Sequence, residues 1–226
     1  MKHYIQQVYN RPVVWLAALA ALLYSSWPLA FFLNPDVVKH ALESQLQTAG
    51  QPYNWVFIAG DALTGAVLLV AAALQYKVFI TGGLVTRLGI IGYALFGGLV
   101  AIAALVPLNC DPQAKTCGPL IHDPFVLIHG FASIVSVLAL LMGTLAVAIA
   151  AYKKHASAVV REVFLVLLAG WLIFGIGSIA QFWWHPGGNG MQNFFITLCS
   201  ASIVAIVAAI EYMSLNNRDP RNNGVD

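Results

Sequence analysis

Six long apolar runs dominate this 226-residue chain and leave few folds open to it. Each run is long enough for a helix that crosses the hydrocarbon core of a bilayer, which takes about 20 residues. In lipid the backbone has no water to bond, so a spanning segment must make its hydrogen bonds internally, as a helix does. The chain is therefore predicted to be all-α, a polytopic membrane helix bundle forming one domain over residues 1–226. The expected transmembrane helices are residues 12–33, 54–76, 84–107, 124–152, 160–184 and 191–213.

The composition excludes most soluble functions. Hydrophobic residues make up 60% of the chain and charged residues only 9%, against roughly 25% charged residues in an ordinary soluble domain. The net charge is +2 and the basic residues are spread over several loops, so no nucleic-acid-binding surface is expected. Membrane lipid is the expected surrounding of the protein, and the short loops leave no room for a separate soluble domain.

The distribution of basic residues predicts the orientation of the bundle. Nine of the eleven lysines and arginines fall in the N-terminus, the second and fourth loops and the C-terminal tail, and only Lys39 and Lys115 fall in the alternate loops. By the positive-inside rule, both termini are predicted to be cytoplasmic, in a bacterial plasma membrane crossed several times. The stretch 12–33 is longer than the core of a secretory signal, so an uncleaved first span is expected.

Asp61 is the most informative single residue, because it lies about two turns inside the second predicted helix. An ionisable side chain at that depth is costly, and by default it faces the bundle interior and has a partner. Asn54 and Thr64 lie near the same helix face and are expected to share its hydrogen bonds. Asp61 is therefore interpreted as a functional group, with a purely structural polar anchor as the alternative.

The fourth predicted helix carries a second polar stripe. His129 lies at a depth similar to that of Asp61, and Ser133 and Ser136 follow on its face at spacings of four and seven residues. A polar stripe on a membrane helix normally points into the bundle, although a single histidine there often only makes an interhelical hydrogen bond. Asp123, directly before Pro124, fits a helix N-cap, which already gives it a structural role.

Asp61, His129 and His185 lie on one side of the membrane and together offer a carboxylate and two imidazoles, with His122 in reserve. This ligand set suits zinc or non-haem iron if the side chains converge. Such a metal would make a hydroxide from bound water, with Ser133 or Asp123 in supporting roles. The spacing matches no metal motif, since a His-Glu-x-x-His pair is absent.

The segments on the side of Asp61 give three further expectations. Residues 34–52, with apolar residues between two prolines, are expected to form a short helix on the membrane surface. Cys110 and Cys117 fit a small structural disulfide on the oxidising side, whereas Cys199 fits a buried apolar position. A haem carrier would need paired axial histidines, for which His129 and His185 are the candidates on this side.

Several short motifs resemble a prokaryotic six-helix membrane family catalogued as domain of unknown function 998. They are residues 54–61 (NWVFIAGD) with Gly65, residues 106–112 (VPLNCDP) with Cys117, and His129-Gly130. The resemblance implies the six-span topology and no settled activity. A more distant likeness is to alkaline-ceramidase-type membrane hydrolases, in which Ser, Asp and His residues surround a zinc ion. That likeness implies roles for Asp61, His129, His185 and a serine such as Ser26 or Ser133, although their His-x-x-x-His pair is missing here.

Two classes of function follow from these residues. The first is a metal-assisted hydrolase of a lipid or another amphipathic substrate, with Asp61, His129 and Ser133 as catalytic residues and Asp61, His129 and His185 as ligands of zinc. The second is a non-enzymatic small transporter or accessory membrane subunit, in which Asp61 and His129 form a structural or proton-coupled pair. The sequence alone does not decide between an enzyme and a transporter.

Overall fold

The computed structural model of the chain describes residues 6–8, 10–35, 43–109, 123–153, 156–184 and 190–216. Within these ranges the regular structure is helical and contains no β-strand. Six helical segments are long and apolar enough to cross a membrane, which confirms the predicted all-α, six-span bundle. These segments are Pro12–Leu33, Asn54–Leu74, Leu84–Leu105, Pro124–Lys153, Ala158–Ala180 and Met191–Leu215.

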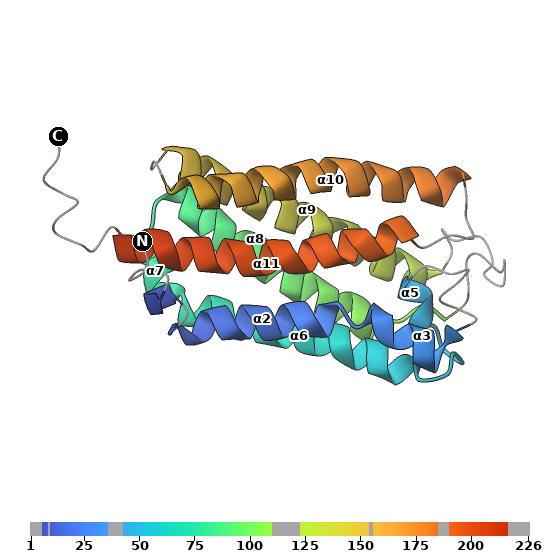
Figure 1. Cartoon of the computed structure of the whole chain (residues 1–226). Coiled ribbons are helices and arrows are strands. Elements are labelled where there is room, and N and C mark those ends of the chain that lie inside the picture. Colours follow the sequence, from blue (N-terminus) through green and yellow to red (C-terminus); the bar gives the residue numbers. More distant parts are fainter. Residues whose placement is uncertain are drawn as a thin grey trace, which may run out of the picture.

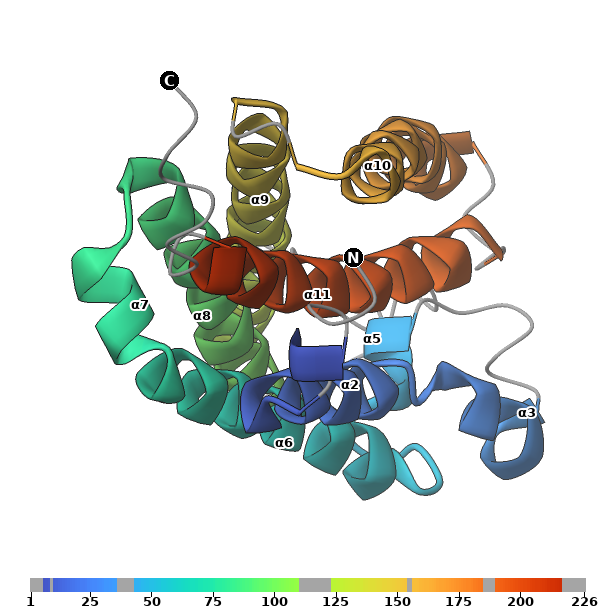
Figure 2. The same cartoon turned by 60° about the vertical axis from the view of Figure 1, so that its left-hand side comes forward.

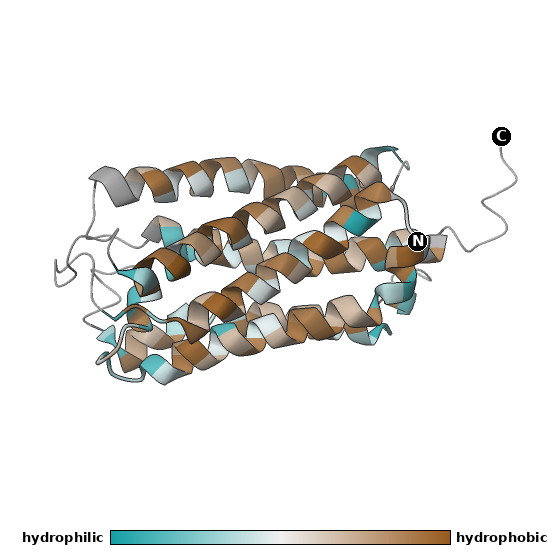
Figure 3. Ribbon diagram, turned by 180° about the vertical axis from the view of Figure 1, so that it is seen from behind, coloured by the Kyte–Doolittle hydropathy of each residue, from teal (hydrophilic) through white to brown (hydrophobic). Residues whose placement is uncertain are grey.

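The long helices lie side by side along one axis, and their polar residues gather near the two ends of the bundle (Figures 1 and 3). They are α2 (Pro12–Tyr24), α6 (Asn54–Leu74), α8 (Leu84–Leu105), α9 (Pro124–Lys153), α10 (Ala158–Trp184) and α11 (Gly190–Asn216). Four short elements complete the described part of the chain: η1 (Trp27–Leu29), α3 (Ala30–Leu33), α5 (Glu43–Leu46) and α7 (Tyr76–Thr81).

Helix α11 is the most enclosed of the six spans, and it contacts α2, α8, α9 and α10 (Figure 2). Helix α8 packs between α6 and α9, and α2 packs against α6 and α11. Among the long helices, α10 packs mainly against α9 and α11. Most of its apolar surface is exposed, as expected of a lipid-facing helix. The packing thus runs α2, α6, α8, α9, α10, with α11 closing the circle.

Glycines allow α8 to approach both of its neighbours closely. A Cβ atom on Gly92 would lie 2.6 Å from the Cα atom of Gly143 on α9. A Cβ atom on Gly65 of α6 would collide with the carbonyl oxygen of Gly97 and with the side chain of Ala101, both on α8. Close backbone approach through small residues is a main source of helix association in lipid, where no hydrophobic force acts between helices.

The described lysines and arginines all lie at one end of the bundle, the end that also holds α7 and the start of α2 (Figure 1). We call it the basic end, and the end that holds α3 and α5 the opposite end. The basic residues are Arg11, Lys77, Arg87, Lys153 and Arg161. Because they cluster in this way, the charge asymmetry that the sequence predicted across loops is also an asymmetry of the folded bundle.

The sequence predicted one continuous helix over residues 12–33, but the first span is interrupted. Helix α2 ends at Tyr24, and the chain resumes as η1 at Trp27 and as α3 at Ala30. The cause is Pro28, which has no N–H to donate to the carbonyl oxygen four residues earlier, that of Tyr24, and whose ring crowds that carbonyl. The interruption at Ser25 and Ser26 lies toward the opposite end.

Residues 43–49, which we call the cover segment, fold into the opposite end of the bundle instead of lying on the membrane surface. In Figures 1 and 2 α5 lies between α11 and the pair α2 and α6. Leu46 is 2% exposed and packs with Ala30 and Phe57. The expectation of a surface helix is therefore wrong for this part of the first loop, because its apolar and amide side chains are buried among the helices.

Candidate functional site

Asp61 lies in the second full turn of α6 and is tied to the cover segment. Its Oδ2 atom accepts a hydrogen bond of 2.6 Å from Nε2 of Gln47. This contact joins a carboxylate inside a transmembrane helix to an amide carried by the segment that closes the opposite end. The prediction that Asp61 has a polar partner is confirmed, but the partner comes from the first loop and not from Asn54 or Thr64.

Asn54 and Thr64, which lie on the same helix as Asp61, make hydrogen bonds to other partners. Asn54 donates from Nδ2 to the carbonyl oxygen of Thr48 in the cover segment at 3.4 Å. Thr64 donates from Oγ1 to the carbonyl oxygen of Gly60 at 2.8 Å and lies 3.3 Å from that of Ala20 in α2. Asn54 thus helps to hold the cover segment, whereas Thr64 helps to join α6 to α2.

The cover segment is also held on its other side, by the stretch that follows α8. The backbone N–H of Ala49 donates to the carbonyl oxygen of Leu108 at 3.1 Å. Together with the Gln47–Asp61 and Asn54–Thr48 bonds, this bond attaches three successive residues of the segment to α6 and to the chain beyond α8. A movement of the segment away from the bundle would have to break all three bonds.

The interruption of the first span packs against the residue that precedes Asp61. A Cβ atom on Gly60 would lie 3.1 Å from the carbonyl oxygen of Leu23 and 3.3 Å from Oγ of Ser26. Gly60 therefore lets the last turn of α2 and the side chain of Ser26 lie directly on the turn of α6 that carries Asp61. A non-helical stretch, a carboxylate and the cover segment meet at one place in the opposite end.

Two side-chain oxygens in the cover segment remain without a hydrogen-bond partner among the described residues. They are Oε1 of Gln47 and Oγ1 of Thr48, on side chains that are 5% and 4% exposed. A buried polar atom without a partner costs about 1–3 kcal/mol, so it calls for an explanation. The one on Gln47 belongs to the same amide whose nitrogen contacts Asp61.

His129 is buried, 6% exposed, and its role in the described part of the chain is to bind the end of α8. Its Nδ1 atom lies 2.9 Å from the carbonyl oxygen of Ala103 and 3.2 Å from that of Val106. Carbonyl oxygens only accept, so Nδ1 carries the proton and satisfies carbonyls that the end of a helix leaves unpaired. In the neutral ring the other nitrogen, Nε2, is then unprotonated, and it takes no part in these two hydrogen bonds.

The serines that follow His129 bond to their own helix. Ser133 donates from Oγ to the carbonyl oxygen of His129 at 2.8 Å, and Ser136 donates to that of Ser133 at 2.7 Å. Ser136 is buried and Ser133 half-buried, so the stripe faces inward as predicted. Asp123 accepts from the backbone N–H of Phe125 at 2.8 Å, which confirms it as the N-cap of α9.

The predicted metal ligands are only partly covered by the structure. Among the described residues no group of three or more histidine, cysteine, aspartate or glutamate side chains could hold a metal ion. Asp61 and His129 lie on α6 and α9, which both pack against α8. The third ligand, His185, lies outside the described residues, as do His122, Cys110 and Cys117. Zinc at this place therefore stays a prediction.

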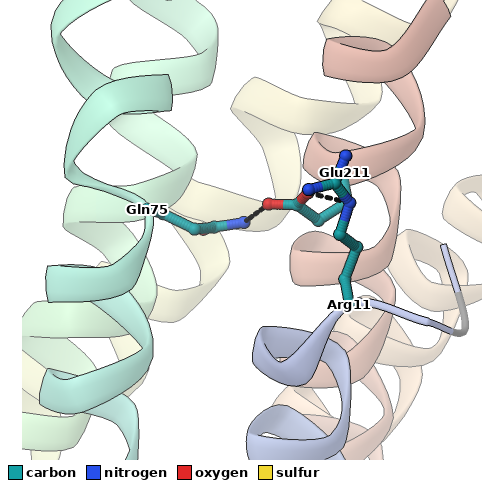
Figure 4. A network of polar contacts seen from close by, with 3 residues as sticks. All are labelled: Arg11, Gln75 and Glu211. Atoms are coloured by element: carbon teal, nitrogen blue, oxygen red, sulfur yellow. Dashed lines mark hydrogen bonds and ion pairs between the residues drawn. The ribbon is translucent and has the colours of Figure 1, made fainter. Parts of the chain in front are cut away.

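A second polar cluster, which the sequence analysis missed, lies at the basic end (Figure 4). Glu211 of α11 lies 3.8 Å from Nε of Arg11 and accepts a hydrogen bond of 2.8 Å from Nε2 of Gln75. Tyr93 of α8 donates to Oε1 of Gln75 at 2.7 Å. Glu211, Gln75 and Tyr93 are 6%, 1% and 0% exposed. The signal that would have found the cluster is Glu211 itself, an acidic residue inside the last apolar run.

The comparison with known protein families identifies the chain's relatives. The model of a family described as "Protein of unknown function (DUF998)" matches residues 16–211. The chain belongs to this family. The match begins within α2, ends at Glu211 and includes Asp61 and His129, so both polar clusters lie largely inside the DUF998 region. No curated protein and no solved structure matches the chain.

Membership of the DUF998 family confirms the resemblance seen in the sequence and brings no activity with it. It agrees with a multi-pass membrane protein of six helices, because the matched region contains four of the spans whole and most of the first and the last. The likeness to alkaline-ceramidase-type hydrolases has no counterpart in these comparisons. Any statement about function has to rest on the two polar clusters.

Proposed function

We propose that the protein is a small cation-coupled transporter of the bacterial plasma membrane, with its binding site at Asp61 and with the cover segment as the gate. The observation that carries the proposal is the hydrogen bond between Gln47 and Asp61. In this proposal the basic end faces the cytoplasm, by the positive-inside rule, and the cover segment faces outward. The transported solute is polar and enters at the opposite end.

The interrupted first span supports a transport function. In many secondary transporters the substrate and coupling-ion sites are built at discontinuous transmembrane helices, where unwound backbone offers free carbonyl groups. Here the interruption at Ser25 and Ser26 lies against Gly60, next to Asp61. Irregular backbone is costly at membrane depth and is tolerated where protein covers it or where it lines a polar site.

The contacts of the cover segment also suggest how binding would open or close the gate. Gln47 donates to Asp61 only while the segment lies in the bundle, so an ion or solute that binds the Asp61 carboxylate competes with this bond or reinforces it. A ligand shifts a conformational equilibrium only through a difference in its affinity for the two states. The carboxylate that binds the ligand is here also an attachment point of the gate, which supplies such a difference.

Cross-linking the gate tests this proposal. The Ala49 N–H donates to the Leu108 carbonyl oxygen at 3.1 Å, so the two residues are neighbours, and the test introduces Ala49→Cys and Leu108→Cys to join them by a disulfide. The double variant is made in a chain whose three native cysteines are replaced. Proteoliposomes are then assayed for electrogenic uptake of a panel of amino acids, amines and sugars under an imposed proton or Na⁺ gradient.

Uptake by the reduced double variant that is lost on oxidation and restored by dithiothreitol is the expected result. The two single-cysteine variants, treated in the same way, serve as matched controls and should keep their uptake. Uptake that persists with the disulfide closed would show that the cover segment is not a gate. If the unmodified protein moves none of the panel, the accessory-subunit alternative replaces the transporter.

The metal-assisted hydrolase is the second candidate, and the geometry of His129 favours it. A histidine that binds a metal commonly donates its other ring N–H to a carbonyl group. His129 makes such a bond from Nδ1 and keeps Nε2 for a ligand. Its partners would be Asp61 and His185, and its substrate a lipid or another amphipathic molecule.

Elemental analysis separates the two candidates. The hydrolase requires near-stoichiometric zinc or iron in the purified protein, and this metal must disappear in a variant carrying Asp61→Ala and His129→Ala. A chain with Ser136→Ala serves as the control, because Ser136 bonds only to its own helix. Metal at the same low level in all three proteins would reject the hydrolase.

A further inference from the structure

Two carboxylates within the transmembrane helices, Asp61 and Glu211, accept hydrogen bonds from other parts of the bundle, whereas Glu162 is exposed near the start of α10; the structure treats the two differently. Glu211 is paired with Arg11 and also accepts a hydrogen bond from Gln75. Asp61 accepts its hydrogen bond from the neutral amide of Gln47. No lysine, arginine or histidine pairs with Asp61 anywhere in the described ranges. One of the two acidic groups therefore has a counter-charge in the structure, and the other does not.

Among the described residues, no basic group supplies a counter-charge to Asp61. The described lysines and arginines all lie at the basic end, and Asp61 lies toward the opposite end. The Nδ1 atom of His129 is already used by the carbonyl groups of Ala103 and Val106 at the end of α8. An ionised carboxylate inside a transmembrane helix is stable only with a partner of opposite charge or in contact with water.

Two oxygens of the cover segment are left without a partner among the described residues, and one of them belongs to the amide that contacts Asp61. Oε1 of Gln47 can only accept or bind a cation, and the hydroxyl of Thr48, the next residue, can donate, accept or bind a cation. Both side chains are at least nine-tenths buried. A hydrogen-bond-donating neutral molecule would satisfy these atoms but would leave the charge of Asp61 unbalanced. A cation would satisfy the oxygens and balance the charge together.

The hydrogen bond between the two side chains limits where a ligand can bind. Nε2 of Gln47 is 2.6 Å from Oδ2 of Asp61, so no atom fits between them, and an ion has to bind beside this bond, at the remaining oxygens. One carboxylate with neutral oxygens balances one positive charge, whereas calcium sites in proteins generally draw on several carboxylates. Unwound backbone, such as the interruption at Ser25 and Ser26, is a common source of further oxygen ligands for Na⁺ in membrane proteins.

We infer that Asp61, with the side-chain oxygens of Gln47 and Thr48, forms a binding site for one Na⁺ ion beneath the cover segment. The inference deepens the proposed transport function, because it names the coupling ion. Bound Na⁺ would hold Gln47 and Thr48 against α6 and so keep the gate closed. Without the ion, the carboxylate and the two oxygens would each gain by exposure to water, which favours opening.

Thermal unfolding of the purified protein in detergent tests the site without any transport assay. NaCl replaces choline chloride at constant ionic strength, and KCl is run in parallel. A ligand that binds the folded protein stabilises it in a way that saturates with concentration. We expect Tm to rise with Na⁺ and to level off, and ²²Na⁺ to bind at about one ion per chain.

Three variants complete the experiment. Asp61→Asn removes the charge and keeps the shape, and Gln47→Leu removes one oxygen; both should weaken Na⁺ binding by at least about tenfold. Glu211→Gln alters the other intramembrane carboxylate and should retain the Na⁺ response. Asp61→Asn should also be at least as stable as the unaltered protein in choline chloride, because its uncompensated charge is gone.

The results that would overturn the Na⁺ site are distinct from those that would overturn the transporter. Stabilisation that is equal in Na⁺, K⁺ and choline, or that survives in Asp61→Asn, rejects the site. Stabilisation that follows pH and ignores Na⁺ also rejects it and assigns a proton to Asp61. A further result is uptake in liposomes that is lost on cross-linking while the protein shows no response to Na⁺. That result would support the cover segment as the gate and reject only Na⁺ as the ion bound at Asp61.

Discussion

Replacing Gly92 by alanine is the most direct test of how the bundle is held together. Gly92 lies on α8 where that helix meets α9, the neighbour with which it packs most extensively. A Cβ atom at this position would lie 2.6 Å from Cα of Gly143, 2.7 Å from the carbonyl oxygen of Ala139 and 2.9 Å from N of Gly143. All three neighbours are backbone atoms, so no side chain can rotate to make room.

The distances give the size of the effect. Ordinary van der Waals contact begins at 3.4 Å, so to relieve the 2.6 Å contact with Gly143 the two helices must separate locally by about 0.8 Å. A gap of this size removes a quarter to a half of the attraction between atoms in contact along the interface. Overpacking of this kind typically costs about 1–3 kcal/mol. In lipid, where packing is a principal source of helix association, we expect the upper half of that range.

Gly98 provides a matched control on the same helix, because a Cβ atom there would meet nothing within 4 Å. Glycine to alanine in a helix gains up to about 1 kcal/mol from helix propensity at either position. The difference between Gly92→Ala and Gly98→Ala therefore removes the propensity effect and isolates the packing cost. Gly143→Ala, whose nearest contact would be 3.2 Å, should fall between the two.

Unfolding by sodium dodecyl sulfate in mixed micelles, followed by circular dichroism, measures the free energy of unfolding of the three variants. The expected order of stability is Gly98→Ala above Gly143→Ala above Gly92→Ala, with about 2–3 kcal/mol between the first and the last. Equal stability of Gly92→Ala and Gly98→Ala would mean that α8 and α9 do not pack as closely as the structure shows, and the reasoning would fail.

Substitutions at three more positions test single contacts by thermal unfolding in detergent. Glu211→Leu should destabilise the protein by about 1–3 kcal/mol because the amide of Gln75 loses its buried partner, whereas Glu211→Gln should lose less; equal losses would deny this contact. Asp123→Ala should cost about 1 kcal/mol through the lost N-cap, and Asp123→Asn almost nothing. Ser133→Ala should change stability by less than about 0.5 kcal/mol, because its hydroxyl bonds only to the carbonyl of His129; an unchanged lipid-hydrolysis rate in this variant would remove Ser133 from a catalytic role.

The sequence predicted the polar residues of the site but not their hydrogen-bond partners. Asp61 and His129 stand out because a polar residue within an apolar run has to be buried with a partner. Which partner it finds depends on which helices become neighbours, and the periodicity of one helix carries no information about that. Gln47 and the end of α8 were therefore out of reach of sequence reasoning, although both bonds involve residues that the sequence displays openly.

The cluster around Glu211, at the basic end, shows the same limit of prediction from sequence. Arg11, Gln75, Tyr93 and Glu211 are separated by up to 200 positions in the chain, and all of them except Glu211 look ordinary in their local context. Arg11 fits a basic flank of the first span and Gln75 fits a helix end. Only the packing of α2, α6, α8 and α11 brings the four side chains to one place at the basic end; Figure 4 shows three of them, Arg11, Gln75 and Glu211.

By itself the sequence determined the number of spans, their approximate limits, the all-α architecture and the clustering of basic residues at one end. Lipid admits only helices for such apolar runs, and lysine and arginine gather in the segments that flank them on one side. The tertiary structure decided the break of the first span beside Gly60, the burial of the cover segment and the partners of Asp61, His129 and Glu211. The physical reason is that the solvent preference of a residue is local, whereas hydrogen-bond partners in a bundle are set by helix neighbours far apart in the chain.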